Sequence, residues 1–246
     1  MLDLRHLTVG TDNATLVRDL SLMVPAKGIT ALVGPSGCGK SSVLKWLAGI
    51  LPQGLRAEGQ ATLDGQPVSL PCSAIGYQPQ SDALFPWLTV AENAALGLQV
   101  KGRTRPDALA RVAPLFRSFG LEGTEGQFPA QLSGGMRQRA AFLRTVVQDS
   151  RYVLLDEPFS ALDAVTRLRM QDWLLGRLAE RPRGVLLVTH DLHEATSLAD
   201  RILVMAASPG RIVAEIPVTL SPGQRSEAAL APLRDTLKLL LLENTS

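Results

Sequence analysis

The chain has 246 residues, 46% of them hydrophobic and 20% charged, a balance that excludes a disordered or fibrous protein. Its 25 Lys and Arg residues against 23 Asp and Glu residues leave a net charge of +2, which gives no electrostatic reason to expect nucleic acid as a partner. The two cysteines, Cys38 and Cys72, cannot form a disulfide framework, so a reducing compartment is expected.

The length suits one large core with an inserted subdomain. Residues 1–9 carry early charges and show no apolar signal-peptide region. No uncharged apolar run approaches the roughly 18 residues that a membrane-spanning helix needs. If this protein works at a membrane, another chain is expected to supply the spanning part.

The first third of the chain predicts strands and one helix. Loose alternation of apolar residues and turn residues indicates strands at residues 2–9, 16–24 and 29–33, and a strand pair over 61–70 around Asp64-Gly65. The third strand is a continuous apolar run, as expected for a strand that is buried on both faces. A helix pattern follows it, over residues 39–48.

The middle of the chain, residues 83–150, favours helix, with linkers at 101–106 and 122–129. The last third returns to alternation, with strands predicted at 152–155, 185–189, 202–205 and 212–216 and a helix at 164–180. A short amphipathic helix is predicted at 233–242. Alternating strands and helices indicate an α/β core that carries a helical insertion.

Residues 34–41 match the phosphate-loop pattern G-x-x-x-x-G-K-[ST] in full, between a predicted buried strand and a predicted helix. Glycines let the backbone N–H groups face phosphate oxygens, and the helix N-terminus adds partial positive charge. Lys40 is expected to reach the β- and γ-phosphates, and Ser41 to hold Mg²⁺. The predicted nucleotide-binding residues are Gly34, Pro35, Ser36, Gly37, Cys38, Gly39, Lys40, Ser41 and Ser42. We interpret Cys38 as a small filler, the alternative being a reactive thiol that nucleotide protects.

Two carboxylates end the predicted strand at 152–155. Asp156 is placed to hold Mg²⁺, directly or through water, and Glu157 to orient and polarise an attacking water. His190 follows the next buried run and could sense the γ-phosphate. Alone, each would be an ordinary polar strand end or loop residue; the phosphate loop upstream favours the functional interpretation.

Residues 132–139 read Leu-Ser-Gly-Gly-Met-Arg-Gln-Arg and closely resemble the signature of the ATP-binding-cassette (ABC) ATPases. The order phosphate loop, Gln80, signature, Asp156-Glu157, Asp163 and His190 is also that of the family. The resemblance implies catalytic roles for Lys40, Gln80, Glu157 and His190, and Mg²⁺ contacts from Ser41, Gln80 and Asp156. Gln78 lies close by, but the spacing from Tyr77 favours Gln80.

In the family, two cassettes bind two ATP molecules between them, head to tail. The resemblance therefore implies that Ser133, Gly134 and Gly135 face the γ-phosphate held by a second cassette, and that Asp163 lies in the loop that crosses the dimer interface. It also implies a P-loop NTPase (RecA-like) α/β core with an N-terminal antiparallel β subdomain and an inserted α-helical subdomain. The expected ABC ATPase domain covers residues 1–220, with the helical subdomain at about 83–150, and residues 221–246 form a tail with a short helix.

The sequence departs from the family in one respect. Members of the family stack adenine on an aromatic residue between the first two strands, but residues 1–33 contain no Phe, Tyr or Trp. The expected position falls near Gly10 or Thr11, and His6 is the only ring nearby. We therefore expect weak stacking and poor discrimination between ATP and GTP.

A stand-alone cassette most resembles the ATPase subunit of a bacterial importer, peripheral at the cytoplasmic face of the cell membrane. Residues 82–93 and 208–213 look like the nitrate, sulfonate and taurine group. Importers of thiamine precursors, a soluble regulatory ABC ATPase and an ordinary P-loop kinase or GTPase are the alternatives. The expected partners are a second cassette, permease subunits docking near Phe85 and Trp87, and, indirectly, a periplasmic or lipid-anchored substrate-binding protein.

Overall fold

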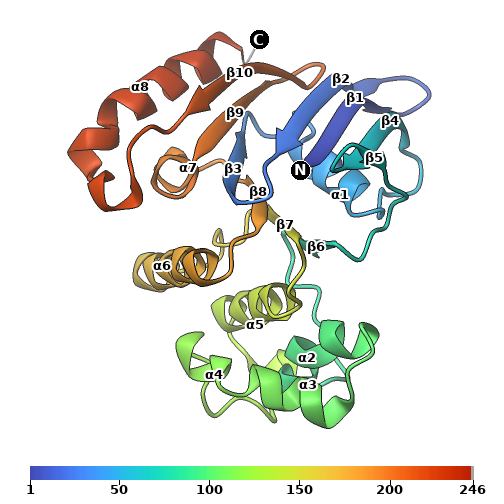
Figure 1. Cartoon of the computed structure of the whole chain (residues 1–246), viewed down its shortest axis with the longest axis vertical. Helices are drawn as coiled ribbons and strands as arrows, with labels where there is room; N and C mark the ends of the chain where they lie inside the picture. Colours follow the sequence, from blue (N-terminus) through green and yellow to red (C-terminus); the bar gives the residue numbers. More distant parts are fainter. Residues whose placement is uncertain (245–246) are drawn as a thin grey trace.

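The computed structural model describes residues 1–244, and these form two β-sheets and a lobe of helices (Figure 1). The helical lobe, α2 to α5, lies at the bottom of Figure 1, and the small antiparallel sheet lies at the upper right. The larger sheet runs between them. This is the α/β architecture that the sequence predicts, with the helical segment inserted between two strands of the larger sheet.

The larger sheet has six strands in the order β10-β9-β3-β8-β7-β6. Neighbouring strands from β9 to β6 pair in parallel, and β10 pairs with β9 in antiparallel fashion at the edge. Its strands are β3 (Gly28–Val33), β6 (Ile75–Gln78), β7 (Tyr152–Asp156), β8 (Gly184–Val188), β9 (Arg201–Ala206) and β10 (Arg211–Pro217). The sequence pattern misses β6 because its glycine and two polar residues interrupt the apolar run.

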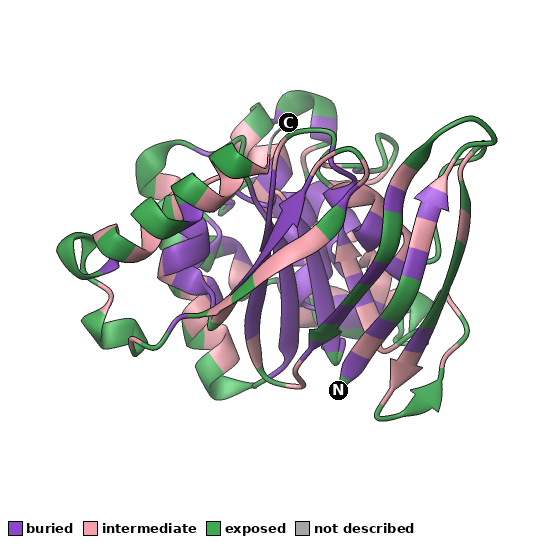
Figure 2. Cartoon of the chain, turned by 90° about the horizontal axis from the view of Figure 1, so that it is seen from above, coloured by how far each residue is buried: buried purple, intermediate pink, exposed green. Residues whose placement is uncertain are grey.

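Side chains of the central strands alternate between two hydrophobic clusters. Ile29, Ala31 and Val33 face one cluster, which continues into the helical lobe, whereas Leu32 faces the other, which lies under the small sheet. Figure 2 shows these central strands buried along their length. Burial on both faces explains why the strands appear in the sequence as continuous apolar runs.

The smaller sheet is antiparallel, in the order β2-β1-β4-β5, with strands β1 (Leu2–Gly10), β2 (Thr15–Val24), β4 (Arg56–Leu63) and β5 (Gln66–Pro67). The predicted turn at Asp64-Gly65 is confirmed, but β4 begins five residues before the predicted strand pair. Helix α1 (Lys40–Leu47) buries Val43, Leu44 and Leu47 in the cluster between the two sheets. This packing fixes the direction in which the N-terminus of α1 points.

The helical lobe contains α2 (Val90–Val100), α3 (Arg105–Val112), α4 (Leu115–Ser118), the 3₁₀ turn η1 (Pro129–Gln131) and α5 (Gly134–Val146). The start of α2 has a capping box between Thr89 and Glu92, and Ser133 caps α5 by accepting a hydrogen bond from the N–H of Met136. Because these polar side chains accept hydrogen bonds from the free N–H groups at the helix starts, the capping residues fix where α2 and α5 begin.

The last helices cover the face of the large sheet that lies on the left of Figure 1: α6 (Ala164–Glu180), α7 (Leu192–Leu198), the 3₁₀ turn η2 (Pro222–Gln224) and α8 (Glu227–Glu243). The bounds predicted for α6 are confirmed. Helix α8 is longer than the predicted short helix because it contains Pro232 rather than starting after it, and the buried Leu230 and Leu237 hold it on the core. In residues 1–244, no helix is both long and apolar enough to cross a bilayer.

Candidate functional site

The loop between β3 and α1 wraps around its own lysine. Gly37 and Gly39 adopt positive φ angles of 80° and 99°, which other residues rarely adopt. A Cβ at Gly39 would meet the Val17 side chain at 2.5 Å, whereas one at Gly37 would meet open space. The Lys40 Nζ donates hydrogen bonds of 2.8 Å to the carbonyl oxygens of Gly34 and Pro35, and the residue is only 7% exposed. The loop is therefore a formed cradle around a buried cation.

A cavity of about 430 Å³ opens in front of this loop. Its wall consists of Leu16, Ser36, Gly37, Gly39, Lys40, Ser41, Ser42, Gln80 and Glu157. Four segments of the chain thus meet here: the start of β2, the phosphate loop, the segment after β6 and the residue after β7. The first N–H groups of α1 have no partner within the helix, so they can bind an anion placed in this cavity.

Asp156 lies at the carboxyl end of β7, 1% exposed, against the first turn of α1. Its carboxylate accepts hydrogen bonds from the Ser41 hydroxyl at 2.9 Å and from the Tyr77 hydroxyl at 3.4 Å. Burial raises the pKa of this carboxyl above its ordinary value, and the hydrogen bond from Ser41 opposes that shift. A divalent cation at this position would offset the cost of keeping the carboxylate charged.

The oxygen donors fit Mg²⁺. Ser41 and Asp156 already touch, and both lie next to the phosphate cradle. Across residues 1–244, no group of three or more His, Cys, Asp or Glu side chains lies close enough to hold a metal by itself. That suits Mg²⁺, which proteins commonly hold through one or two side chains together with substrate phosphates and water.

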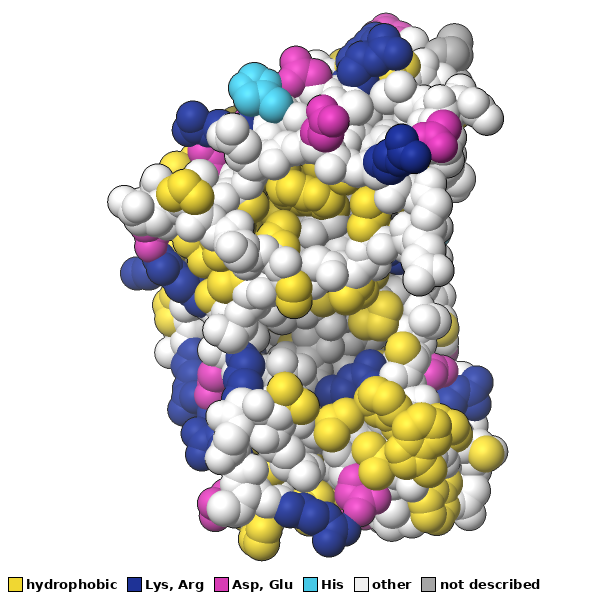
Figure 3. All heavy atoms as spheres, turned by 90° about the vertical axis from the view of Figure 1, so that its right-hand side faces the viewer, with side chains coloured by type: hydrophobic (Ala, Val, Ile, Leu, Met, Phe, Trp, Pro, Cys, Tyr) yellow, Lys and Arg dark blue, Asp and Glu magenta, His cyan; other side chains and the backbone are white. Residues whose placement is uncertain are grey.

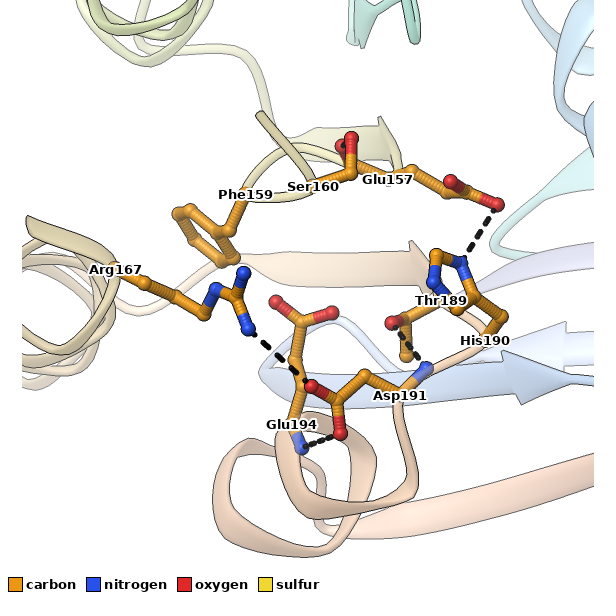
Figure 4. A pocket seen from close by; sticks show the side chains of 8 residues that line it. All are labelled: Glu157, Phe159, Ser160, Arg167, Thr189, His190, Asp191 and Glu194. Carbon is orange, nitrogen blue, oxygen red and sulfur yellow. Dashed lines mark hydrogen bonds and ion pairs between the residues drawn. The ribbon is translucent and has the colours of Figure 1, made fainter. Parts of the chain in front are cut away.

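Glu157 is held by its neighbours at the mouth of the cavity. Its backbone has a positive φ of 47°, a conformation that costs energy in a residue with a Cβ and occurs preferentially at functional sites. Its N–H donates to the Val188 carbonyl at 2.9 Å, which ties the turn to β8. One carboxylate oxygen accepts from Gln80 Nε2 at 3.2 Å, and the other lies 3.2 Å from His190 Nδ1 (Figure 4). Three polar groups therefore converge beside the phosphate loop.

The signature residues lie elsewhere. Ser133 and Gly134 are exposed at the start of α5, and Gly135 is half-buried. Asp163 is exposed at the start of α6, where it caps the helix by accepting from the N–H of Thr166 at 3.0 Å. None of these four residues lines the phosphate cavity. A single chain thus forms a phosphate site, and the exposed start of α5, which carries the signature residues, lies outside the cavity of that site.

The structure also places Gln78, Gln80 and Cys38. Gln78 is fully buried, with its amide oxygen 2.6 Å from the Thr145 hydroxyl, whereas Gln80 reaches the cavity. Cys38 is 2% exposed and packs in the cluster between the two sheets, which favours its role as a filler.

Some residues at the site carry no signal in the sequence. Leu16 lines the cavity from β2, and no motif singles it out. Four residues around His190 were also missed, namely Arg167, Gln171, Thr189 and Glu194, because nothing in their spacing reports a contact between α6 and α7. His6, the ring nearest the expected adenine position, is exposed and pairs with Asp19 at 2.7 Å.

The fold and the cavity together define a P-loop nucleoside triphosphatase: a parallel sheet, a Gly-rich loop opening a helix, and carboxylates at the end of a neighbouring strand. A family model described as ABC transporter matches residues 17–160. The chain belongs to the ABC transporter family, of which it carries the ATP-hydrolysing domain.

Named relatives cover nearly the whole chain. The aliphatic sulfonates import ATP-binding protein SsuB 2 of Burkholderia cenocepacia is 40% identical over 96% of this chain and 86% of its own length. The taurine import ATP-binding protein TauB of Rhizobium johnstonii is 42% identical over 79% of this chain and 73% of its own. The formylaminopyrimidine import ATP-binding protein ThiZ of Halalkalibacterium halodurans is 35% identical over 96% and 93%.

Among solved structures, the ATP-binding cassette MJ0796 in a dimeric post-hydrolysis state bound to ADP and Pi is similar, with a TM-score of 0.78 and 26% identity. The similarity covers 90% of this chain and 100% of that one. The predicted fold and family are thereby confirmed.

Proposed function

We propose that this chain is the ATPase subunit of a bacterial importer for small sulfonates or related anions, peripheral at the cytoplasmic face of the cell membrane. One observation carries the catalytic part: Glu157 is held between Gln80 and His190 at the mouth of the phosphate cavity. Similarity to the sulfonate and taurine import proteins over most of the chain supports the transport part.

The chain's residues divide the task of binding ATP. The N–H groups of the phosphate loop and the N-terminus of α1 bind the phosphates, and Lys40 neutralises their charge. The ammonium group has three N–H donors and gives two of them to the carbonyl oxygens of Gly34 and Pro35, so the third is available for a phosphate oxygen. Ser41 and Asp156 would hold Mg²⁺, which supplies charge stabilisation at the β- and γ-phosphates.

Glu157 acts on the water. Its carboxylate is positioned to accept a hydrogen bond from the attacking water and so to direct it at the γ-phosphate. His190 and Gln80 fix the two carboxylate oxygens, so little reorganisation is needed when charge develops. His190 is also placed to contact the γ-phosphate. The chemistry is therefore mainly positioning and charge stabilisation.

The signature residues act in a second copy. Ser133, Gly134 and Gly135 open α5, and the first N–H groups of a helix have no partner within it, which suits binding of the γ-phosphate held by another chain. Two chains related by a two-fold axis would each supply a phosphate cradle and a signature, completing two sites. ATP then closes the dimer and hydrolysis reopens it, and this motion drives the permease.

A surface on the helical lobe suits the permease. Phe85 and Trp87 lie in the loop between Gln80 and α2, with ring centroids 5.4 Å apart, and Trp87 is 70% exposed. Figure 3 shows hydrophobic side chains gathered on this lobe. Exposed aromatic rings beside the loop that carries Gln80 would let a docked helix sense the nucleotide site.

The docking surface predicts a specific phenotype for Trp87→Ala. Because the ring is mostly exposed, its loss is expected to change the melting temperature by less than about 3 °C. Copurification with the permease is expected to fall at least about tenfold. Phe116→Ala, which empties the buried core of the same lobe, serves as the destabilising control. A Trp87 variant that unfolds like the Phe116 variant would contradict docking and make Trp87 part of the core.

The similarity to ThiZ supports a second substrate class, a formylaminopyrimidine. The transported substrate meets the permease and its binding protein, so no residue of this chain is expected to recognise it. Purification of this chain from detergent-solubilised membranes of its source tests the proposal. A multi-span permease is expected to copurify, and its binding protein can be screened against sulfonates, taurine and pyrimidines. Recovery of soluble proteins alone, with ATPase activity intact, would contradict a transport role.

A further inference from the structure

Helix α6 carries a polar stripe on one face. Asp163, Arg167 and Gln171 are spaced four residues apart from the N-cap of the helix, so their side chains lie along one side. Asp163 belongs to the loop at residues 160–163, which is expected to cross the dimer interface, and we call this segment the interface loop. The stripe therefore starts at the interface loop and runs along the helix toward α7.

Arg167 joins the interface loop to the segment that carries His190. Its guanidinium donates a hydrogen bond of 3.1 Å to the Leu162 carbonyl in the interface loop. The same group lies 3.5 Å from the carboxylate of Asp191, the residue that follows His190 (Figure 4). The planar guanidinium group of Arg167 thus contacts both Leu162 and Asp191, which lie 29 residues apart in the sequence.

The segment around His190 is held from the other side as well. The Thr189 hydroxyl accepts a hydrogen bond from the N–H of Asp191 at 3.0 Å. Asp191 also caps α7, accepting from the N–H groups of His193 and Glu194 at 2.8 Å and 3.3 Å. Gln171 Nε2 donates to Glu194 at 3.4 Å. A displacement of Asp191 therefore carries His190 with it.

A small cavity of about 60 Å³ separates these groups, and Glu157, His190 and Arg167 all line it. The Nε of Arg167 is buried without a hydrogen-bond partner, so the guanidinium uses only part of its donor capacity. The space and the unused donor allow the side chain a second arrangement when the interface loop moves.

We propose that Arg167 is a positioning residue that transmits the state of the interface loop, through Asp191, to His190 and hence to Glu157. The proposal rests on the head-to-tail dimer of the proposed function. Arg167 does not line the phosphate cavity, so it acts on the hydrolytic step and leaves ATP binding largely unchanged. An ordinary ion pair at this distance, with the arginine side chain 34% exposed, would have little effect on the rate.

The test compares steady-state ATPase kinetics of Arg167→Ala, Arg167→Lys, Asp191→Asn and the double variant Arg167→Ala/Asp191→Asn. The Asp191→Asn substitution removes the charge that faces Arg167, while the amide oxygen of the new side chain can still cap α7. Arg169→Ala is the matched control, because Arg169 lies on the same helix and is exposed. Melting temperatures check that every variant folds.

The expected result is a kcat about 5–20 fold lower for Arg167→Ala, with KM for ATP changed less than about twofold. The Lys variant should recover part of the loss, because it keeps the charge but cannot form both contacts. The kcat of the double variant should lie within about twofold of the kcat of Arg167→Ala, because both substitutions break the same contact between Arg167 and Asp191. Full additivity, or a wild-type kcat in Arg167→Ala, would overturn the proposal.

A second measurement separates this proposal from the dimer on which it rests. ATP-dependent dimerisation is followed by analytical ultracentrifugation in Glu157→Gln, with and without Arg167→Ala. Equal dimerisation of both variants is expected, because Arg167 transmits closure without forming the interface. If Glu157→Gln dimerises but Glu157→Gln/Arg167→Ala does not, Arg167 supports the interface itself and the proposed transmission is overturned. If the single variant Glu157→Gln does not dimerise with ATP, the head-to-tail dimer is contradicted, and the proposal for Arg167 is contradicted with it.

Discussion

The phosphate loop and the signature are both helix starts preceded by Gly or Ser, yet their surroundings differ sharply. At the start of α1, Lys40 and Ser41 lie in a cavity together with Asp156 and Glu157 from another element. At the start of α5, Ser133 and Gly134 are exposed, and neither of them lines the phosphate cavity. The same local structure is thus complete in one place and incomplete in the other, which is what two half-sites in separate chains require.

The largest effect is expected at the complete half-site. Glu157→Gln keeps the size of the side chain, but it removes the charge that polarises water and replaces one of the two acceptor oxygens by an NH2 group. We expect kcat for ATP to fall about 10²–10⁴ fold, with nucleotide affinity retained. Single-turnover hydrolysis and equilibrium ATP binding measure the two effects. A loss of less than tenfold would show that another group orients the water.

The incomplete half-site predicts complementation. Lys40→Ala and Gly134→Asp are each expected to be inactive, the second because its carboxylate repels a phosphate. A Cβ at Gly134 meets nothing closer than 3.9 Å, so that variant is expected to fold. In an equal mixture, half of the dimers are mixed and each has one intact site, so about a quarter of the wild-type rate should return. A monomeric enzyme would show no recovery and no ATP-dependent dimer.

The base-binding side of the cavity predicts a moderate effect. Leu16 is the apolar side chain in the cavity wall on the β2 side, and residues 1–33 contain no Phe, Tyr or Trp. We expect ATP and GTP to compete within about tenfold of each other, because the lost stacking contact is worth roughly 1 kcal/mol. Competition with a fluorescent nucleotide measures the ratio. An ATP preference above 100-fold would show that another group recognises adenine.

The buried carboxylate of Asp156 predicts an effect on stability rather than on turnover. Burial raises its pKa, so the unfolded chain releases this proton at a lower pH than the folded chain does. The destabilisation is absent below the ordinary pKa of 3.8, grows as pH rises through the folded pKa, and is constant above it. Asp156→Asn should therefore stabilise the Mg²⁺-free, nucleotide-free protein at pH 7 by about 1–3 kcal/mol.

Chemical denaturation between pH 4.5 and 8 measures the Asp156 prediction, with Asp172→Asn on the exposed face of α6 as the control. The difference between wild type and Asp156→Asn should be smallest at the acid end. A difference that is independent of pH would mean that the substitution acts through packing rather than charge.

Two regions of the fold show where sequence reasoning succeeds. The phosphate loop and the strand ending at Asp156 were predictable because a continuous apolar run, a glycine pattern and a helix start occupy adjacent positions in the chain. The bounds of α6 were predictable because Asp163 caps it and the apolar period persists to residue 180. Helix α8 shows the limit, since tertiary burial of Leu230 extends it through Pro232 against local preference.

The sequence by itself determined the family, the phosphate loop, the pair Asp156 and Glu157, and the candidate His190, because those signals are local or are ordered motifs. Only the tertiary structure decided that Leu16 lines the cavity and that Arg167 touches both the interface loop and Asp191. These contacts join segments that are distant in the chain. Their geometry depends on how helices and sheets pack, and no spacing of residues along the chain records it.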